Sequence, residues 1–307
     1  WKGMLQEAKA IVEDYEKWFG SFPYEKLCVV ERLWPTGGGH SPASFVILNE
    51  MPRTPDRPLQ GSPNSPVDLS RYREYYLAHE IAHQWWGQAV TGQRYRDQWL
   101  SEGLAQFAVV QYLRAKLGER TFAGLIRRFS QWTERKSKWG PITLGSRLSY
   151  LDFDAYQAIV YNKSAVALNM LLDLLGEEVF FKGLHEFFEK YKYRSARTAN
   201  FIRCMEQVAG RDLKQFFEGW FDSHLLPEVR VAHDIRREGD GFVLKFRVNQ
   251  TRNVFVFPLW VEWEENRQKV RQKFEVSAAT QEFEFHAASR PAKIKINPDK
   301  FVPGNFN

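Results

Sequence analysis

Apolar positions along the chain follow a helical spacing first and a strand-like alternation later. Residues 5–18 repeat apolar side chains at the three- and four-residue intervals of an amphipathic helix, and short apolar runs over 22–30 and 45–48 are typical of strands. From Leu69 to about Trp220 the helical spacing dominates. Glycines that end helices interrupt it, so several helices are expected in this stretch. These glycines are Gly118, Gly140, Gly176 and Gly210.

After Pro227 the pattern changes to alternation of apolar and polar residues, which is typical of strands. Several short strands separated by turn residues predict a small antiparallel β-sandwich. The expected fold class is therefore α+β, with a mostly helical domain over residues 1–226 and a β-sandwich over residues 227–307. The alternating segments lie at 242–248, 255–259, 283–285 and 294–296.

Composition narrows the protein class. Of the 307 residues, 44% are hydrophobic and 15% aromatic, which is typical of a folded protein. The net charge is +6, the basic residues are spread among acidic ones, and no nucleic-acid-binding motif accompanies them, so no nucleic-acid partner is expected.

No apolar run reaches about 18 residues, so no membrane segment is expected. Because the chain starts without Met in a helical pattern, we expect a longer polypeptide. Five prolines over 51–67 predict a long loop.

The candidate chemistry begins at His79-Glu80-Ile81-Ala82-His83, an H-E-x-x-H pentapeptide inside a proline-free stretch, residues 70–86, that is helical in pattern. In a helix, imidazoles at positions i and i+4 stand on one face, close enough to bind one metal ion. Glu80 lies about 100° round the helix from His79, where it borders the site and can take a proton from water. Core packing is the alternative, but two buried histidines beside a carboxylate would be costly without a metal. The pentapeptide therefore predicts two metal ligands, His79 and His83, and a general base, Glu80.

A catalytic zinc site has three protein ligands and one open position. Eighteen residues separate His83 from Glu102, enough for the first helix to end, a turn through residues 91–93, and a second helix to pack back across it. Asp97 or Ser101 can cap that second helix. Taken alone, an acid in a first helical turn compensates the helix dipole. Beside the pentapeptide, we predict that Glu102 is the third ligand of one Zn²⁺.

These motifs resemble a known family. The stretch from His79 to Gly87, followed at the same spacing by Trp99 to Ala105, is similar to the zinc aminopeptidases related to membrane alanyl aminopeptidase, the aminopeptidase N-like gluzincins. The similarity covers about Tyr15 to Pro303. It implies a thermolysin-like catalytic domain followed by a small β-sandwich, the order that the periodicity also indicates.

The resemblance also implies a role for Tyr161. The family has a Tyr-Glu-Lys-Gly motif whose tyrosine hydroxyl helps zinc stabilise the tetrahedral oxyanion, and the corresponding residues here are Tyr161-Asn162-Lys163-Ser164. Tyr161 keeps the phenol, whereas Asn162 and Ser164 depart from the usual Glu and Gly. From the residues alone, Tyr161 is one aromatic on a helix, and core packing is the simpler interpretation.

The amine-binding motif of the family is altered. Its members carry Gly-x-Met-Glu-Asn on an edge strand, where the Glu binds the substrate's α-ammonium, and residues 38–42 here read Gly-Gly-His-Ser-Pro. Ser41 stands in place of that Glu, and a hydroxyl cannot replace its charge-assisted hydrogen bond. Gly38 and Gly39 would still let a substrate backbone approach, and His40 offers a polar contact. We predict that these last three residues bind substrate.

The sequence thus predicts a zinc-dependent metallopeptidase acting on a peptide or protein substrate. An aminopeptidase that releases N-terminal residues is the first interpretation. An endopeptidase or a hydrolase of N-blocked peptides is the alternative, because the amine-anchoring Glu is absent. A scaffold that retains zinc and binds peptides without hydrolysis is a second alternative, although every residue for attack by water is present.

Overall fold

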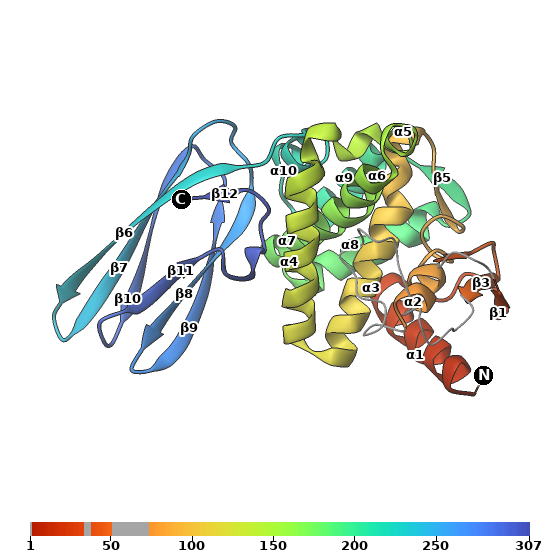
Figure 1. The fold of residues 1–307 in the computed structure, drawn as a ribbon, viewed down its shortest axis with the longest axis horizontal. Coiled ribbons are helices and arrows are strands. Elements are labelled where there is room, and N and C mark those ends of the chain that lie inside the picture. The colour runs from red at the N-terminus through yellow and green to blue at the C-terminus, as the bar shows by residue number, and fades with distance from the viewer. Residues whose placement is uncertain (1, 34–37, 51–73) are drawn as a thin grey trace.

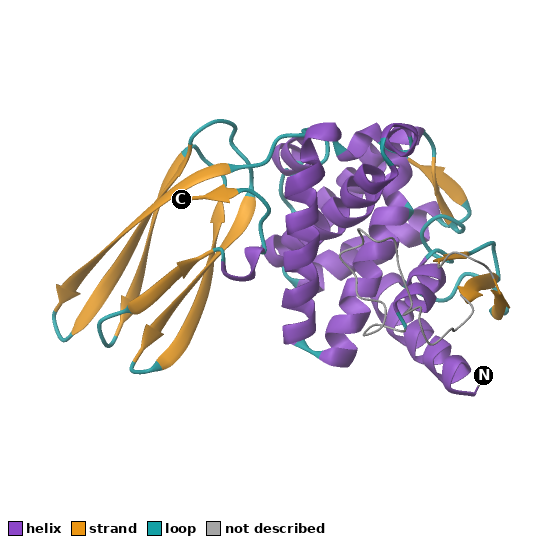
Figure 2. Cartoon of the chain, viewed as in Figure 1, coloured by secondary structure: helices purple, strands orange, loops and turns teal. Residues whose placement is uncertain are grey.

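The computed structural model describes residues 2–33, 38–50 and 74–307. It consists of a mostly helical part, from Lys2 to Trp220, and a part built from two β-sheets, from Glu228 to Phe306, and the two parts lie side by side (Figure 1, Figure 2). The second part is called the sheets below. The N-terminus lies at the end of the helical part that faces away from the sheets (Figure 1). The mixed α+β class predicted from the sequence is confirmed. The proline-rich loop predicted over 51–67 lies outside the described residues.

The N-terminal region combines one helix with a three-stranded sheet. The predicted helix over 5–18 lies inside α1, whose Tyr15 is fully buried and donates from its hydroxyl to the carbonyl oxygen of Ala78 at 3.0 Å. The strand predicted over 22–30 begins only at Cys28, because Pro23 interrupts it and Phe22 packs against Trp85 instead. The sheet has the order β1-β3-β2, with β1 parallel and β2 antiparallel to β3. The elements are α1 (Lys2–Phe19), β1 (Cys28–Leu33), β2 (Gly38–His40) and β3 (Phe45–Glu50).

The central helices surround a large apolar core. Helices α3, α7 and α9 end at Gly118, Gly176 and Gly210, where the sequence predicted helix ends. The predicted turn over 91–93 instead contributes to strand β4, which pairs in parallel with β5, a partner too distant in sequence for any local pattern to reveal. The elements are α2 (Tyr75–Ala82), β4 (Val90–Gly92), η1 (Tyr95–Leu100), α3 (Glu102–Leu117), α4 (Glu119–Lys136), η2 (Ser137–Trp139), η3 (Ile142–Leu144), α5 (Arg147–Leu151), α6 (Phe153–Tyr156), η4 (Gln157–Lys163), α7 (Ser164–Leu175), α8 (Glu177–Tyr191), β5 (Arg194–Ala196), α9 (Thr198–Ala209) and α10 (Lys214–Trp220).

Elements α6, η4 and α7 follow one another without a break. Their combined run, Phe153–Leu175, is the one helix in the described part of the chain that is long and apolar enough to cross a membrane by length and composition. Since 78% of its most apolar window is buried inside the structure, it also has the character of a core helix. Its middle segment, η4, is wound as a π-helix.

The C-terminal part contains two sheets, of order β10-β7-β6-β12 and β11-β8-β9. All pairs are antiparallel except β12 with β6. Aromatic rings join the sheets: Phe246 of β7 lies 6.0 Å from Phe274 of β9, and Trp263 of β8 lies 5.6 Å from Phe285 of β10. The elements are β6 (Glu228–Glu238), β7 (Gly241–Gln250), β8 (Phe257–Glu265), β9 (Gln268–Val276), β10 (Thr280–Ala287), β11 (Ala292–Ile296), η5 (Pro298–Lys300) and β12 (Asn305–Phe306).

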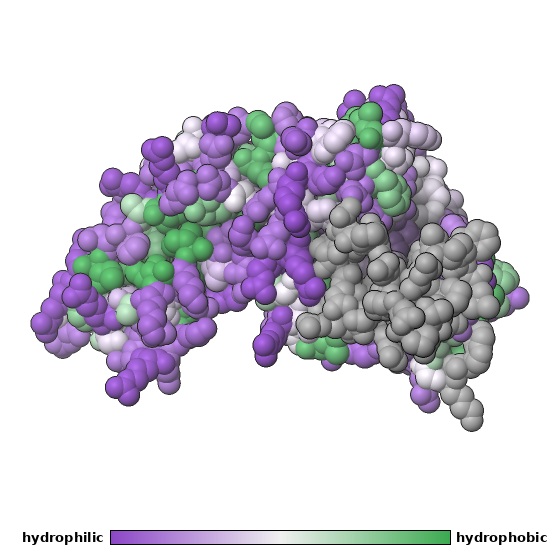
Figure 3. All heavy atoms as spheres, viewed as in Figure 1, coloured by the Kyte–Doolittle hydropathy of each residue, from purple (hydrophilic) through white to green (hydrophobic). Residues whose placement is uncertain are grey.

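The surface over α4, next to the sheets, is mostly hydrophilic (Figure 3). Arg127 and Arg135 of α4 are exposed to solvent. The opposite face of α4 buries Leu125, Ile126 and Phe129 in the core. The helix is therefore amphipathic and covers the apolar interior.

Candidate metal centre

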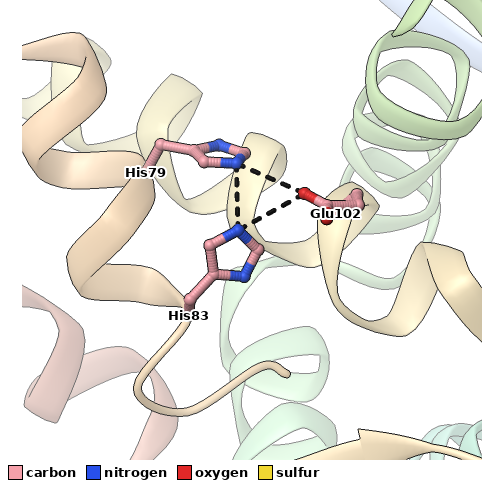
Figure 4. Close-up of side chains that lie close together, drawn as sticks. All are labelled: His79, His83 and Glu102. Atoms are coloured by element: carbon pink, nitrogen blue, oxygen red, sulfur yellow. Dashed lines mark hydrogen bonds and ion pairs between the residues drawn. The ribbon is translucent and has the colours of Figure 1, made fainter. Parts of the chain in front are cut away.

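Helices α2 and α3 bring the three predicted metal ligands together. His79 lies in α2, His83 is its C-cap residue, and Glu102 is the first residue of α3. The Nε2 atoms of the two histidines are 3.1 Å apart. Oε2 of Glu102 lies 3.4 Å from Nε2 of His79 and 3.3 Å from Nε2 of His83. Figure 4 shows the three side chains pointing toward one another from the two helices.

This donor set fits a zinc ion. Zinc–ligand bonds of about 2.0–2.1 Å at tetrahedral angles place the ligand atoms about 3.3 Å apart. The three observed separations, between 3.1 and 3.4 Å, match that spacing. Two imidazoles and one carboxylate also leave the fourth position open, as catalytic zinc sites require.

The two histidine rings differ in their hydrogen bonding. Nδ1 of His83 lies 2.9 Å from the carbonyl oxygen of Trp86, so this nitrogen carries the proton and leaves Nε2 free to bind a metal. The hydroxyl of Ser101 lies 3.2 Å from the same Nδ1. Nδ1 of His79 is buried without a hydrogen-bond partner among the described residues. These contacts thus orient the ring of His83, whereas the ring of His79 is positioned by stacking on Tyr75 and Tyr161.

The centre attracts positive charge. Burial would lower the pKa of His83, but the charge and hydrogen bond of Glu102 outweigh burial and raise it to about 9. Burial would raise the pKa of Glu102, but the two imidazoles hold it well below its usual range. Glu102 is thus ionised at neutral pH, and its charge can be balanced by a proton on His83 or by a cation that displaces this proton.

Glu80 borders the same centre. Its side chain is buried, and burial raises the pKa of its carboxyl, opposed by the charges of His83 and His79. A carboxylate with a raised pKa is a better proton acceptor near neutral pH. Strand β2 lies so close to Glu80 that a Cβ at Gly39 would be only 2.6 Å from Cγ of Glu80. Glycine at this position therefore permits the contact between the strand and the carboxylate.

Tyr161 approaches the centre from the π-helical segment η4. Its ring stacks on His79 with centroids 5.8 Å apart and an angle of 12°. Burial raises its pKa well above the usual value, and the negative charge of Glu102 adds to this. The phenol is therefore protonated at neutral pH and can donate a hydrogen bond. π-Helical turns are frequent at functional sites, and here the turn carries the predicted residue.

The predicted substrate-binding residues form strand β2, at the edge of the N-terminal sheet. Gly38 and Gly39 are partly buried and His40 is exposed. Ser41, the next residue, is buried. Its hydroxyl donates to the carbonyl oxygen of Glu80 and accepts from Nε2 of Gln84 at 2.7 Å. Ser41 therefore ties the end of the edge strand to α2.

Sequence reasoning missed the roles of three further residues at the centre: Gln98, Ser101 and Tyr156. Nε2 of Gln98 donates to Oε1 of Glu102 at 3.5 Å. The ring centroids of Tyr156 and Tyr161 are 5.4 Å apart. Asp97 or Ser101 was expected to cap α3, but no side chain makes the capping hydrogen bond there: Ser101 contacts His83, and the Asp97 carboxylate accepts from the backbone of Arg94. The only available signal was proximity in sequence to Glu102 or Tyr161.

Comparison with known proteins identifies the family. Residues 59–220, more than half of the chain, match the peptidase family M1 domain. The chain belongs to peptidase family M1. Among its M1 relatives, aminopeptidase N of Streptomyces lividans is 29% identical over 182 residues, which are 57% of this chain and 21% of that protein. A probable aminopeptidase 2 of Sulfurisphaera tokodaii is 27% identical over 276 residues, covering 85% of this chain and 33% of that protein.

A solved structure of similar fold supports the architecture. The crystal structure of Legionella pneumophila aminopeptidase A in complex with aspartic acid matches with a TM-score of 0.75 at 20% identity, covering 99% of this chain and 34% of that one. The M1 chain described here thus spans about a fifth to a third of the length of the curated relatives named above. The predicted resemblance to aminopeptidase N-like proteins is confirmed.

Proposed function

We propose that this M1 chain carries the active site of a zinc-dependent peptidase, with one Zn²⁺ held by His79, His83 and Glu102. The observation that carries the proposal is the convergence of three ligand atoms at 3.1 to 3.4 Å from one another. When bound, zinc supplies a Lewis acid that polarises the scissile carbonyl and lowers the pKa of water.

The chain's own residues perform the proton transfers. Glu80 takes a proton from the attacking water and passes it to the leaving amine, as its burial and raised pKa favour. Tyr161 keeps its proton and donates a hydrogen bond from its hydroxyl to the carbonyl oxygen as negative charge develops there. Its protonated state and its stacking on His79 support this role.

The aminopeptidases among the M1 relatives support release of N-terminal residues from a peptide substrate. We place the substrate backbone along β2, with Gly38, Gly39 and His40 in contact with it. Two observations support this placement: β2 lies at the sheet edge, and Gly39 abuts Glu80. A strand at an edge has free main-chain groups that can pair with an extended peptide.

We also propose that residues 1–226 form a thermolysin-like catalytic domain and residues 227–307 a β-sandwich domain. The start of β6 at Glu228 supports this boundary. The ring contacts between the two C-terminal sheets, such as Phe246 with Phe274, support a sandwich.

A pair of variants tests the catalytic assignment. Glu80→Gln should lower kcat by about 10²- to 10⁴-fold, because general base catalysis contributes about that much, and should keep one zinc per chain. His83→Ala should lose the metal itself, measured by elemental analysis after dialysis. Wild-type turnover in Glu80→Gln, or stoichiometric zinc in His83→Ala, would contradict the assignment.

A second candidate, an endopeptidase or a hydrolase of N-blocked peptides, is favoured by one observation. Ser41 replaces the amine-anchoring Glu, and its hydroxyl is already engaged by Gln84 and the backbone of Glu80. Comparison of an aminoacyl substrate with its N-acetylated form separates the two. A preference of at least about tenfold for the free amine supports the aminopeptidase, since a lost charge-assisted contact is worth about that much. Stoichiometric zinc without hydrolysis of any peptide in a defined library would instead indicate the non-catalytic scaffold.

A further inference from the structure

A buried chain of hydrogen bonds joins the three elements that supply the metal centre. The hydroxyl of Tyr75 donates to Oε1 of Gln106 at 2.7 Å, and Nε2 of Gln106 donates to Oδ1 of Asn162 at 2.7 Å. All three side chains are buried, with exposures of 8%, 2% and 3%. Tyr75 lies in α2, Gln106 in α3 and Asn162 in η4.

Each member lies within one helical turn of a residue in the proposed active site. Tyr75 precedes His79 by four residues, and its ring stacks on the imidazole at 6.4 Å and 12°. Gln106 follows Glu102 by four residues, and Asn162 follows Tyr161 directly. Because i and i+4 side chains share one helix face, the bonds of Tyr75 and Gln106 constrain His79 and Glu102 on the neighbouring turn. Asn162 acts through the backbone of the π-helical segment that it shares with Tyr161.

The donors and acceptors of this hydrogen-bond chain determine the orientation of the Gln106 amide. Gln106 uses its carbonyl oxygen toward α2 and its amide nitrogen toward η4, so one side chain fixes both contacts. A buried polar group that loses its partner cannot form a hydrogen bond to water instead, so breaking either bond costs free energy. The two bonds therefore resist displacement of α2, α3 or η4 relative to one another.

We propose that Tyr75, Gln106 and Asn162 are positioning residues that hold His79, Glu102 and Tyr161 in register for metal binding and catalysis. This inference rests on the proposed function of the centre. It also gives a role to Asn162, which replaces the Glu of the family motif: its side-chain oxygen accepts the bond from Gln106.

The chain contains a matched control. Nε2 of Gln111 donates to Oδ1 of Asn169 at 2.6 Å, and both side chains are buried. This pair also joins α3 to the helical run containing η4 and α7, with the same chemistry. It lies several residues further from the centre along both elements, nine beyond Glu102 and eight beyond Tyr161. Loss of the control pair should therefore affect stability without affecting the centre.

The test compares Tyr75→Phe and Asn162→Leu with Asn169→Leu in the same chain. Zinc affinity is measured by competition with a chromophoric chelator, kcat and KM with a peptide substrate, and stability by thermal unfolding. Tyr75→Phe keeps the ring stacked on His79 and removes only the hydroxyl. We expect Tyr75→Phe and Asn162→Leu each to weaken zinc binding and lower kcat by about tenfold or more, with KM within about twofold. Asn169→Leu should lower the unfolding temperature and leave zinc affinity and kcat unchanged.

A conservative variant provides the rescue. Asn162→Asp keeps an oxygen that accepts from Gln106, so kcat and zinc affinity should stay within about threefold of wild type. Equal losses of zinc affinity and kcat in Asn162→Leu and Asn169→Leu would show a merely structural role and overturn the inference. If the wild type binds zinc and hydrolyses peptides, unchanged zinc affinity and kcat in Tyr75→Phe and Asn162→Leu would overturn this inference and leave the proposed function standing. If the wild type binds zinc but hydrolyses nothing, the catalytic proposal fails while the zinc comparison still decides the inference; a wild type without zinc affinity overturns both.

Discussion

At the residue scale, Lys163 is a buried charged side chain next to the metal centre's π-helical segment, and its burial costs free energy. It is fully buried at the end of η4, and its ammonium donates to the carbonyl oxygen of Ser223 at 2.8 Å. Burial lowers its pKa to about 7. This hydrogen bond ties the helical run that carries Tyr161 to the chain just after α10. Burial of the charged amine costs free energy.

The pH dependence of stability tests this cost. Between about pH 7 and pH 10 the unfolded chain keeps the Lys163 proton, whereas the folded chain has lost it. The unfolded state binds more protons there, so this group makes stability rise with pH, and its penalty is complete below about pH 7. Relative to Lys163→Met, the wild type should gain about 1 kcal/mol per pH unit across this window. Urea unfolding of both proteins at pH 7, 8 and 9 measures it, and parallel pH profiles would contradict the lowered pKa.

At the element scale, the close approach of α3 to the π-helical run sets the distance between Glu102 and Tyr161. A Cβ at Gly103 would lie 2.5 Å from Cβ of Ser164 and 3.3 Å from the carbonyl oxygen of Val160. Gly103 directly follows Glu102, so only a glycine there lets the two elements meet at this spacing.

Gly103→Ala should therefore push the elements apart. We expect a loss of about 1–3 kcal/mol in unfolding free energy from overpacking and a lower kcat. Gly124→Ala is the control: it lies within α4, and the nearest atom to its Cβ would be 4.0 Å away, so it should be neutral or stabilising. Adding Ser164→Gly to Gly103→Ala removes the clashing Cβ and should restore kcat. If Gly103→Ala matches the control in urea unfolding and in kcat, the spacing argument is wrong.

Local patterns predicted much of this arrangement. The H-E-x-x-H spacing predicted two ligands on one face, because helical periodicity determines which residues share a face. Glu102 was predicted from its distance along the chain and from the need of a zinc site for a third ligand, and the structure brings the three side chains together. The π-helical winding of η4, the pairing of β4 with β5 and the inward hydroxyl of Ser41 were not predictable. The last two depend on contacts between segments distant in sequence, which no local spacing encodes.

At the scale of the whole molecule, the helical part and the sheets are joined by a mixed apolar and polar contact. The indole of Trp220 donates to the carbonyl oxygen of Val256 at 2.7 Å, and its ring lies 5.2 Å from that of Phe255. The indole of Trp260 donates to Asp173 of α7. Because α7 continues the run that contains Tyr161, the sheets contact the helical core at an element of the proposed active site.

This contact raises the question of whether the sheets take part in catalysis or act as a packing partner. Phe255 is buried against Trp220 and Gly219. Phe255→Ala should cost about 3–5 kcal/mol, which corresponds to a fall of roughly 5–10 °C in unfolding temperature for a chain of this size. As a packing partner alone, the sheets should leave kcat and KM unchanged at temperatures where the variant is folded. Calorimetry and steady-state kinetics on the same preparation decide between the roles. A lowered kcat in fully folded Phe255→Ala would mean that the sheets hold α7, and with it Tyr161, in the active arrangement.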